Sequence, residues 1–492
     1  MFKPSDKQQK IFDTWNDTDK NILINAVAGS GKTTTLLELL QYCKYKTLFL
    51  AFNKSVQEEI QSKIDEKGLK QGKAMTMHSL GLSAIRQHYK GKSKVVIKNG
   101  KNFELLKQIQ NKHKTTFKYM KWEDKLKLSY TLMDMNDISR LFLTDNIDAI
   151  KKHLQSMDKN FVEHKNIVSL WASFVDFREK SYTEKTVIID FNDMIYLAAR
   201  DKLYIPVEPY YLMVDEAQDL NLAQHKLVEN LIAQGTIIKW IAVGDRNQSI
   251  YGFSGAYSSS FDKFLDAGNV EELPLDICYR CAQNIIDETN EVYDVMEYGR
   301  EEKGIVGVVK DVNEIKPESM IICRNTSPII KLYFGLLGSG MPVYIKGDDI
   351  LTSITRFLKP YLNYTVGGAK IELQYKLEEL QADKGDEARI KLHVFKENYA
   401  NFKALIANMS TDYEVIKVLI DKIKNLFKIK DKAVMLCTIH KAKGLEADVV
   451  YILNENLIPS KFATSPEQLT QERNLKYVAR SRAKKELYYL NL

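Results

Sequence analysis

The chain has 492 residues, of which 45% are hydrophobic and 27% are charged. These proportions are typical of a soluble globular protein, and the length suggests about three or four folding units. The formal net charge of +7 weakly favours a polyanionic partner without identifying one. No stretch approaches the ~18 uninterrupted apolar residues of a membrane span, so we expect no membrane-embedded segment.

Targeting and cysteine content favour a cytoplasmic location. The first fifteen residues, MFKPSDKQQKIFDTW, lack the apolar core of a signal peptide. Cys278 and Cys281 have CxxC spacing, but neither a second pair nor a nearby histidine completes a zinc site. We therefore expect reduced cysteines and a cytoplasmic protein, or one in the host cytoplasm if a phage encodes it.

Apolar runs that end in glycine or acidic residues alternate with amphipathic segments. The strand-like runs lie within 21–33, 47–52, 210–219 and 237–245. Such alternation, with polar residues at the strand ends, predicts a parallel α/β sheet. In these sheets ligands bind beyond the carboxyl ends of the strands.

The α/β pattern is interrupted twice by helical, charged sequence. It returns at 304–346 and again at 433–453, which indicates a second α/β domain. The fold prediction is therefore α/β, with two parallel-sheet domains that each carry a mostly helical insertion. The predicted boundaries are 1–85 and 187–270 for the first domain, 86–186 for its insertion, 271–350 and 430–492 for the second domain, and 351–429 for its shorter insertion.

A glycine-rich loop, AVAGSGKTT at 26–34, lies between a predicted strand and a predicted helix. Gly29 and Gly31 let the backbone N–H groups turn toward a phosphate at the helix N-terminus. Lys32 can reach the β- and γ-phosphates of ATP, and the Thr33 hydroxyl can bind Mg²⁺. A chance glycine-rich turn is the alternative, but the strand–loop–helix order argues against it. The predicted nucleotide-binding residues here are Ala26, Ala28, Gly29, Ser30, Gly31, Lys32, Thr33 and Thr34.

Two adjacent acids follow the third strand-like run, in VDEAQD at 214–219. Asp215 is predicted to bind Mg²⁺ together with Thr33, and Glu216 to act as the general base toward the attacking water. A solvated strand end is the alternative interpretation. Together with the phosphate loop, the acids favour ATP hydrolysis over transfer of the phosphoryl group to a bound substrate.

Further motifs occur in a fixed order along the chain. They are TMHSLG (76–81), IDFNDMI (189–195), VDEAQD, VGDRNQSIYGFSGA (243–256), CYRC (278–281), TIHKAKGLEADVV (438–450) and LKYVARSRAKK (475–485), preceded by PSDKQQKIF (4–12). In this order the chain resembles superfamily 1 helicases of the UvrD, PcrA and Rep type. The resemblance covers nearly the whole chain except the two insertions, and implies two RecA-like P-loop domains.

The resemblance implies roles for residues around the nucleotide. Gln8 would contact the adenine edge, and Tyr279 would stack on the base. Glu446 would contact the ribose, with Gly444 in the same loop.

Three further residues would respond to the γ-phosphate, again by resemblance. Gln248 would sense it, and Arg280 and Arg482 would stabilise its transition-state charge. Both arginines lie far in sequence from Lys32, so ATP would bind between two domains and hydrolysis would loosen them. Taken singly, each arginine could instead have an ordinary surface or ion-pair role.

Aromatic and polar residues beside the motifs are candidate contacts to a DNA strand, because aromatic rings stack on bases without reading sequence. Phe52 could instead be core packing. The family has an arginine where this chain has Ser254, which puts the strength of strand binding or of coupling in doubt. The lysine-rich segment 90–127 suits backbone contact, or is a solvated face. The predicted DNA-binding residues are Phe52, Asn53, Thr76, His78, Tyr251 and Phe253.

These features predict a monomeric, ATP- and Mg²⁺-dependent DNA helicase or translocase that acts on single-stranded DNA and at single-strand/duplex junctions. Movement from 3′ to 5′ follows from the resemblance alone. Three alternatives stay open: a translocase that strips proteins without unwinding, an ATP-gated binding module without motor activity, and an RNA motor. No residue that would sense a 2′-hydroxyl is identifiable, and no protein partner is indicated.

Overall fold

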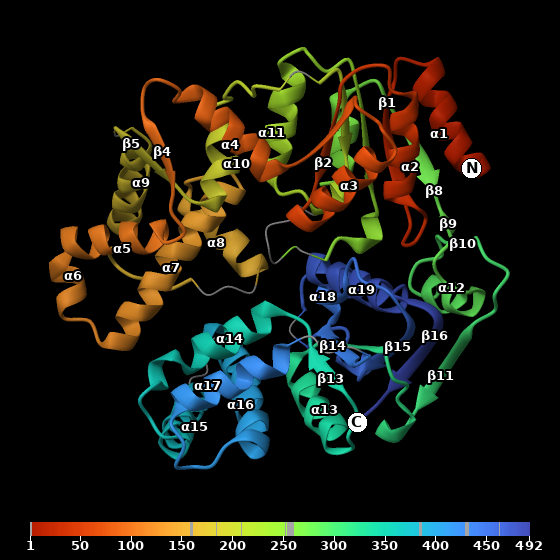
Figure 1. Ribbon diagram of the computed structural model, residues 1–492. Helices are drawn as coiled ribbons and strands as arrows, with labels where there is room; N and C mark the ends of the chain where they lie inside the picture. Colours follow the sequence, from red (N-terminus) through yellow and green to blue (C-terminus); the bar gives the residue numbers. More distant parts are fainter. Residues whose placement is uncertain are drawn as a thin grey trace. The chain divides into compact units, whose positions relative to one another are not determined.

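The chain forms two compact units, each built on one six-stranded sheet (Figure 1). The computed structural model describes residues 2–492 except 158–160, 184, 208, 251, 253–259, 383–385, 429–431 and 462. The first unit comprises residues 1–26 and 31–275, and the second comprises 27–30 and 276–492. Every strand pairing within the two large sheets is parallel. The predicted α/β class with two parallel sheets is confirmed.

The first sheet has the strand order β3-β2-β6-β7-β1-β8. All four strand-like runs predicted for this half of the chain are strands in it. The two edge strands, β3 and β8, complete it, so the first sheet extends to Leu275. Its strands are β1 (Asn21–Ala26), β2 (Thr47–Ala51), β3 (Gly72–Thr76), β6 (Tyr211–Val214), β7 (Lys239–Gly244) and β8 (Val270–Leu275).

Helices cover both faces of this sheet, which explains why its inner strands are continuously apolar. Successive side chains of a strand point to opposite faces. Accordingly, Phe49 of β2 packs in one core cluster, with Phe12, whereas Leu50 packs in the other, with Leu80. The helices are α1 (Asp6–Asp17), α2 (Lys32–Leu39), α3 (Lys54–Glu66), α4 (Met77–His88), α10 (Phe191–Arg200) and α11 (Leu222–Ala233).

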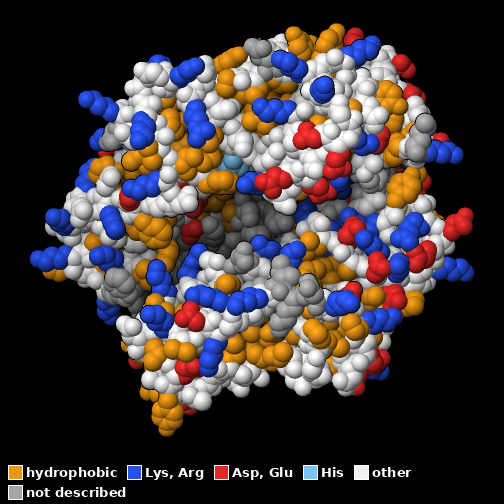
Figure 2. Space-filling model, viewed as in Figure 1, with side chains coloured by type: hydrophobic (Ala, Val, Ile, Leu, Met, Phe, Trp, Pro, Cys, Tyr) orange, Lys and Arg blue, Asp and Glu red, His pale blue; other side chains and the backbone are white. Residues whose placement is uncertain are grey.

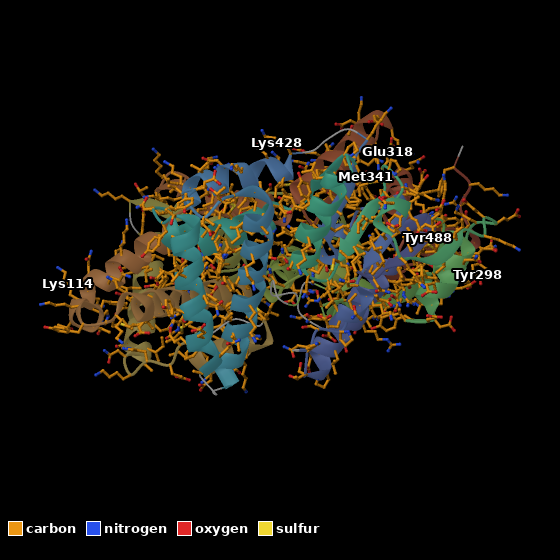
Figure 3. The ribbon with its side chains drawn as sticks, turned by 90° about the horizontal axis from the view of Figure 1, so that it is seen from below. Lys114, Tyr298, Glu318, Met341, Lys428 and Tyr488 are labelled. Carbon is orange, nitrogen blue, oxygen red and sulfur yellow. The ribbon has the colours of Figure 1, made fainter. Side chains whose placement is uncertain are left out.

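The helical region of the first unit has a hydrophobic core of its own, which includes Ile109, Leu132 and Phe174. A parallel two-stranded ladder, β4 (Lys94–Ile97) with β5 (Thr186–Ile189), joins its two ends. Lys114 lies at the outer end of the region (Figure 3). Its helices are α5 (Lys101–Lys112), α6 (Lys114–Lys118), α7 (Trp122–Leu141), α8 (Ile147–Ser156) and α9 (Ile167–Thr183).

A buried ionic cluster fastens this helical region to α10. The Lys101 Nζ of α5 lies 2.6 Å from Asp193 Oδ2, and the Arg140 Nη1 of α7 lies 2.8 Å from Asp193 Oδ1. Arg140 also pairs with Asp190 at 2.6 Å; Lys101, Arg140 and Asp193 are buried, and Asp190 is 14% exposed. Burial alone would raise the pKa of Asp193, but Arg140 and Lys101 hold it well below its usual range. Asp193 is therefore a buried carboxylate that two cations require.

The second sheet has the order β11-β16-β15-β12-β14-β13. Its strands are β11 (Ile305–Val309), β12 (Met320–Cys323), β13 (Val343–Ile345), β14 (Val434–Thr438), β15 (Ala447–Leu453) and β16 (Ala483–Leu490). The helices beside it are α12 (Gln283–Asn290), α13 (Thr326–Gly338), α18 (Ile439–Ala442) and α19 (Pro466–Arg480). A small parallel pair, β9 (Ile277–Cys278) with β10 (Glu297–Tyr298), flanks α12 in the chain.

The second helical region consists of α14 (Asp348–Leu358), α15 (Val366–Ala382), α16 (Asp386–Met409) and α17 (Ile416–Lys424). Unlike the first, it shares one core with its sheet: Phe402 and Leu405 of α16 belong to the same cluster as Leu436 of β14. Both α/β halves thus carry mostly helical additions, as predicted. Short 3₁₀ helices lie at 40–42, 217–219, 246–248, 262–267, 312–314, 359–361, 425–427 and 455–457.

Positive charge is dispersed on the surface. Figure 2 shows lysine and arginine side chains spread among acidic and apolar ones on the face in view. A binding face therefore has to be found from individual residues rather than from the net charge.

None of the described helices combines the length and the apolar character that crossing a membrane requires.

Candidate active site

The glycine-rich loop connects the end of β1 to the start of α2, as the sequence predicts. Gly29 and Gly31 have φ of +71° and +81°, a conformation that residues with a Cβ rarely adopt. Gly31 is the N-cap of α2, and Lys32 and Thr33 form its first turn. The Ser30 hydroxyl donates to Val27 O at 2.9 Å and closes the loop. The loop thus presents a helix N-terminus suited to an anion.

Thr33 and Asp215 meet at the carboxyl edge of the first sheet. Thr33 Oγ1 lies 3.3 Å from Asp215 Oδ2, and Asp215 is only 3% exposed. Burial, together with the charge of Glu216, raises the pKa of Asp215 to about 7, although Lys32 acts in the opposite direction. A hydroxyl beside a buried carboxylate is an oxygen set that fits Mg²⁺, and a cation there would relieve the cost of burying the charge.

Glu216 starts a hydrogen-bonded chain that ends at Gln248. Gln218 Nε2 donates to Glu216 Oε2 at 2.5 Å, and Gln218 Oε1 accepts from the Asp245 backbone N–H at 2.9 Å. Gln248 Nε2 in turn donates to Asp245 Oδ2 at 2.7 Å. A Cβ on Gly244 would lie 2.4 Å from Gln218 Oε1, so this chain depends on a glycine. The predicted base and the predicted γ-phosphate sensor are therefore physically connected.

Gln8 lies beside the phosphate loop, held by the start of α1. It forms a capping box with Ser5, and its Nε2 donates to Thr35 Oγ1 at 2.9 Å. A Cβ on Gly31 would be 3.8 Å from Gln8 Nε2. The fixed amide is thus placed next to the loop that is predicted to hold the phosphates.

In the second unit, two of the predicted nucleotide-site residues, Arg280 and Glu446, form an ion pair. Arg280 Nε lies 2.6 Å from Glu446 Oε2, an ion pair without hydrogen-bond angles, and Lys484 Nζ lies 2.7 Å from Glu446 Oε1. Burial raises the pKa of Glu446, but the hydrogen bond from Lys484 and the charge of Arg280 outweigh it and keep the pKa low. Arg482 is buried, and its Nε donates to Val478 O at 2.9 Å. Gly444 is exposed with φ +82°.

The segment 27–30 belongs to the second unit by its contacts. The Ala28 backbone N–H donates to the Tyr477 hydroxyl at 3.2 Å, and the Tyr279 N–H donates to Gly29 O at 2.9 Å. A Cβ on Gly29 would come within 2.4 Å of Arg280 Cβ. Half of the phosphate loop therefore packs on the segment that carries Tyr279 and Arg280, while the ring of Tyr279 stays 41% exposed.

Two of the predicted strand contacts of the first unit line one hollow of about 380 Å³. Phe52 and His78 line it, together with Phe191. The rings of His78 and Phe191 stack with centroids 3.6 Å apart, and Phe191 is 58% exposed. Burial lowers the pKa of His78 to about 4, so the ring is neutral at pH 7. The two stacked rings thus offer an uncharged stacking surface within the hollow.

The other predicted strand contacts have structural positions or fall outside the described residues. Asn53 caps α3 by accepting from Val56 N–H at 2.9 Å, and Thr76 caps α4 by accepting from Ser79 N–H at 3.1 Å. Tyr251 and Phe253 lie outside the described residues, as does Ser254.

The comparison with known families decides the classification. Residues 5–267 match the family model of the UvrD/REP helicase N-terminal domain, and residues 351–491 match the UvrD-like helicase C-terminal domain. The chain belongs to the UvrD/REP helicase family. This confirms the resemblance predicted from the ordered motifs, and makes the chain a compact UvrD-type helicase.

Two relatives of this UvrD-type helicase match along nearly its whole length, and a third matches over about half of it. A probable DNA helicase of Mycoplasma pneumoniae is 24% identical over 97% of the chain and 81% of its own length. The ATP-dependent DNA helicase Rep of Buchnera aphidicola is 24% identical over 95% and 90%. The ATP-dependent DNA helicase PcrA of Leuconostoc citreum is 27% identical over 56% of the chain and 37% of its own length. The match to the structure of an arterivirus nonstructural protein 10 (helicase) covers 98% of this chain and 61% of the arterivirus chain, at 11% identity and a TM-score of 0.36.

Sequence analysis missed several residues of this UvrD-type site. Gln218 and Asp245 stand inside motifs that were identified, but only the fold shows that they join Glu216 to Gln248. Phe191 stands inside IDFNDMI, where an exposed aromatic directly after a helix cap was the available signal. Arg140 lines the same hollow from α7, and nothing in the sequence connects it to that place.

Proposed function

We propose that this UvrD-type helicase hydrolyses ATP with Mg²⁺ and uses the energy to move along single-stranded DNA from 3′ to 5′, unwinding duplex at single-strand junctions. The observation that carries the proposal is the hydrogen-bonded chain Glu216–Gln218–Asp245–Gln248. It links the residue suited to activating water with the loop that leads toward the strand contacts. The family and the names of its relatives support DNA as the substrate.

The phosphate end of the site follows from its chemistry. The N–H groups at the start of α2 and the Lys32 ammonium would bind the β- and γ-phosphates. Thr33 and Asp215 would hold Mg²⁺, which would supply positive charge against the phosphates. Glu216 has φ +50° and the hydrogen bond from Gln218, which fix its carboxylate to accept the proton of the attacking water.

Contacts from the second unit would complete the site when ATP is bound. Arg280 and Arg482 are proposed to stabilise the charge on the γ-phosphate, and Gln8 and Tyr279 to hold adenine. In the structure Arg280 is paired with Glu446. ATP would compete for this arginine, so that binding and hydrolysis change the interactions of the second unit. This gives the two-state element that a motor requires.

A single strand would bind at the hollow beside His78 and Phe191. Stacking on an exposed ring requires an unstacked base, which single-stranded DNA provides without sequence preference. Phe52 borders the same hollow and directly follows β2. Asn53, Thr76, Tyr251 and Phe253 remain proposed contacts, and the protein is proposed to be a monomer in solution.

Tailed duplexes test the proposal. A duplex with a 3′ single-stranded tail should be unwound with ATP and Mg²⁺, whereas a duplex with a 5′ tail or blunt ends should not. Lys32→Ala should abolish both ATP turnover and unwinding. ATP-dependent removal of a protein from single strands without any unwinding would assign a stripping translocase instead. Faster action on RNA than on DNA would contradict the proposed substrate.

A further inference from the structure

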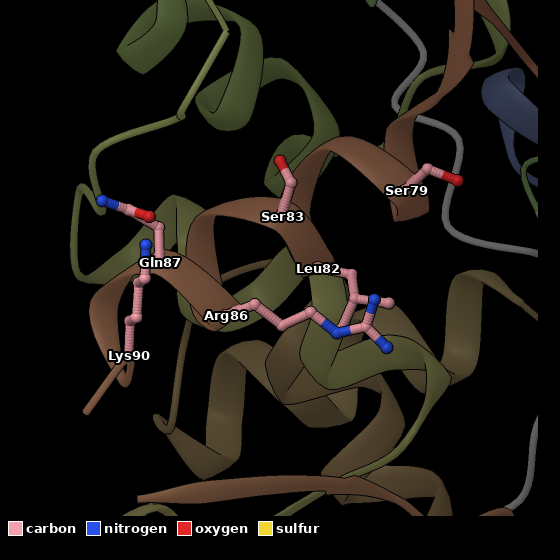
Figure 4. A pocket seen from close by; sticks show the side chains of 6 residues that line it. All are labelled: Ser79, Leu82, Ser83, Arg86, Gln87 and Lys90. Atoms are coloured by element: carbon pink, nitrogen blue, oxygen red, sulfur yellow. The ribbon is translucent and has the colours of Figure 1, made fainter. Parts of the chain in front are cut away.

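Helix α4 begins at the strand hollow and continues as a polar, positively charged face. Its apolar side, with Leu80, Ala84 and Ile85, is fully buried. A Cβ on Gly81 would lie 2.0 Å from Met194 O, so α4 packs tightly against α10. The opposite face cannot turn inward and stays in solvent. That face lines a second hollow of about 530 Å³ (Figure 4), formed by Ser79, Leu82, Ser83, Arg86, Gln87 and Lys90.

The cations of this face are not used within the described part of the chain. Arg86 and Lys90 are exposed, and neither has an ion pair with a described carboxylate. The other arginines of the first unit differ, because each of them holds at least one carboxylate: Arg140, Arg178, Arg200 and Arg246. Arg86 is therefore the arginine of this unit whose guanidinium is left for an external anion.

The spacing of the face fits a linear polyanion. Residues three or four apart lie on one side of a helix, and Figure 4 shows Arg86 beside Leu82 on α4, with Lys90, just past the end of the helix, beside Gln87. From Ser79 to His88, the last residue of α4, the helix rises by about 14 Å at 1.5 Å per residue, and Lys90 follows two residues later. A nucleic-acid strand presents several phosphates over that length.

The same helix connects this face to the base-stacking hollow. His78, in the first turn of α4, stacks on Phe191, and Ser79, the next residue, already lines the second hollow. The Ser83 hydroxyl donates to Leu80 O at 2.6 Å, so it has no proton left for a phosphate. Gln87 is exposed and supplies a neutral amide donor beside Lys90 (Figure 4).

We infer that this face of α4 is a binding subsite for the phosphodiester backbone of the single strand whose bases stack at His78 and Phe191. Arg86 and Lys90 each neutralise one phosphate, and Gln87 donates to an oxygen between them. The inference rests on the proposed function and adds to it the path of the strand beyond the stacking hollow. It predicts that strand affinity depends on these cations while ATP chemistry does not.

The salt dependence of strand binding tests this directly. Replacing both cations, in the variant Arg86→Gln/Lys90→Gln, should make the slope of log K against log salt shallower by about 1.4, since each phosphate contact on a single strand contributes about 0.7. Affinity for a fluorescent single strand at low salt should fall several-fold, with kcat for ATP at saturating DNA unchanged. Arg86→Lys, which keeps the charge, should retain the wild-type slope.

A matched control removes the same charge elsewhere. Lys44 and Lys46 are exposed and precede β2, at the sheet edge opposite the carboxyl ends of the strands. Lys44→Gln/Lys46→Gln should leave the slope and the affinity as in the wild type. Equal slopes for the α4 variant and this control would overturn the inference, as would a change seen only with blunt duplex. A wild-type protein that neither binds single strands nor is stimulated by them would refute the proposed function itself, and the inference with it.

Discussion

Thr33 Oγ1 lies 3.3 Å from Asp215 Oδ2, although 182 positions separate the two residues in the chain. The first is in the opening turn of α2 and the second directly follows β6. Parallel strands bring both to the same edge of the sheet, where ligands of α/β folds bind.

Removal of the Thr33 hydroxyl should weaken the use of Mg²⁺. Among the described residues, Thr33→Ala leaves Asp215 as the one predicted protein ligand of Mg²⁺. The Mg²⁺ concentration for half-maximal ATP turnover should therefore rise at least ~10-fold, which is the size of effect seen when groups that support a metal site are lost. Thr33→Ser keeps the hydroxyl and should behave nearly as the wild type. A Mg²⁺ titration of ATP turnover measures both. An unchanged midpoint for Thr33→Ala would remove this residue from the proposed metal site.

Glu216→Gln should separate binding from turnover. The amide keeps the shape and can still contact Gln218, but it cannot accept a proton, so turnover should fall by at least ~100-fold. Affinity for a fluorescent ATP analogue should stay within a few-fold of the wild type. Single-turnover hydrolysis and equilibrium binding measure the two effects. Hydrolysis at the normal rate would show that another group activates the water.

Gln218 should control how strongly DNA stimulates the ATPase. Gln218→Met fills similar volume but removes both hydrogen bonds, those to Glu216 and to the Asp245 N–H. We expect the ratio of DNA-stimulated to basal turnover to fall at least ~10-fold, as when about 1.4 kcal/mol of coupling is lost. Combining it with Gln248→Met should add little further, because residues of one network are not additive. Full additivity of the two changes would contradict a shared path.

The buried ionic cluster should dominate the stability of the first unit. Asp193→Asn leaves Lys101 and Arg140 short of a carboxylate, and breaking a buried pair costs about 3–5 kcal/mol. The exposed pair of Arg200 with Asp201 is the control, since Asp201→Asn should cost about 1 kcal/mol or less. All four tryptophans lie between residues 15 and 240, so their fluorescence during urea unfolding reports this unit alone. Equal losses of unfolding free energy in the two variants would show that the cluster does not stabilise this unit.

His225 should make the first unit less stable in mild acid. Burial lowers its pKa to about 4, and its ring lies 2.7 Å from the Ser260 hydroxyl. Below the unfolded pKa of about 6.5 the unfolded chain takes up the proton first, so the stabilisation present above that pH is lost as the pH falls. From about pH 7.5 to about pH 5.5 the wild type should lose about 1.4 kcal/mol more than His225→Gln. Parallel pH profiles in the tryptophan assay would contradict this.

Sequence patterns predicted the inner strands because both faces of those strands are buried. Phe49 and Leu50 of β2 enter opposite cores, and this produces a continuous apolar run. The edge strands were not predicted, because they lack such a continuous apolar run. β8 contains two glutamates and Pro274, and it pairs only with β1 in the described sheet. Proline is tolerated at an edge, where one side of the strand needs no donors.

The part of the site that lies within sequence motifs could be predicted from the sequence. Lys32, Asp215 and Gln248 could be assigned to the carboxyl edge of the sheet from their positions after strands. The link through Gln218 could not, because it depends on the side chain filling the space above Gly244. The position of Arg140 at the strand hollow could not be predicted either, since it depends on a contact with Asp190, fifty positions away in the chain. Such contacts are set by tertiary packing rather than by local pattern.

ATP hydrolysis with and without single-stranded DNA, at about 50 mM and about 200 mM salt, is the most direct test of a strand-coupled ATPase. We predict strong stimulation by DNA that weakens at the higher salt, with less stimulation by RNA, and no turnover by Lys32→Ala under any condition. Hydrolysis by the wild type at one rate, whether or not DNA is present, would contradict the coupling from Glu216 to Gln248 and with it the motor.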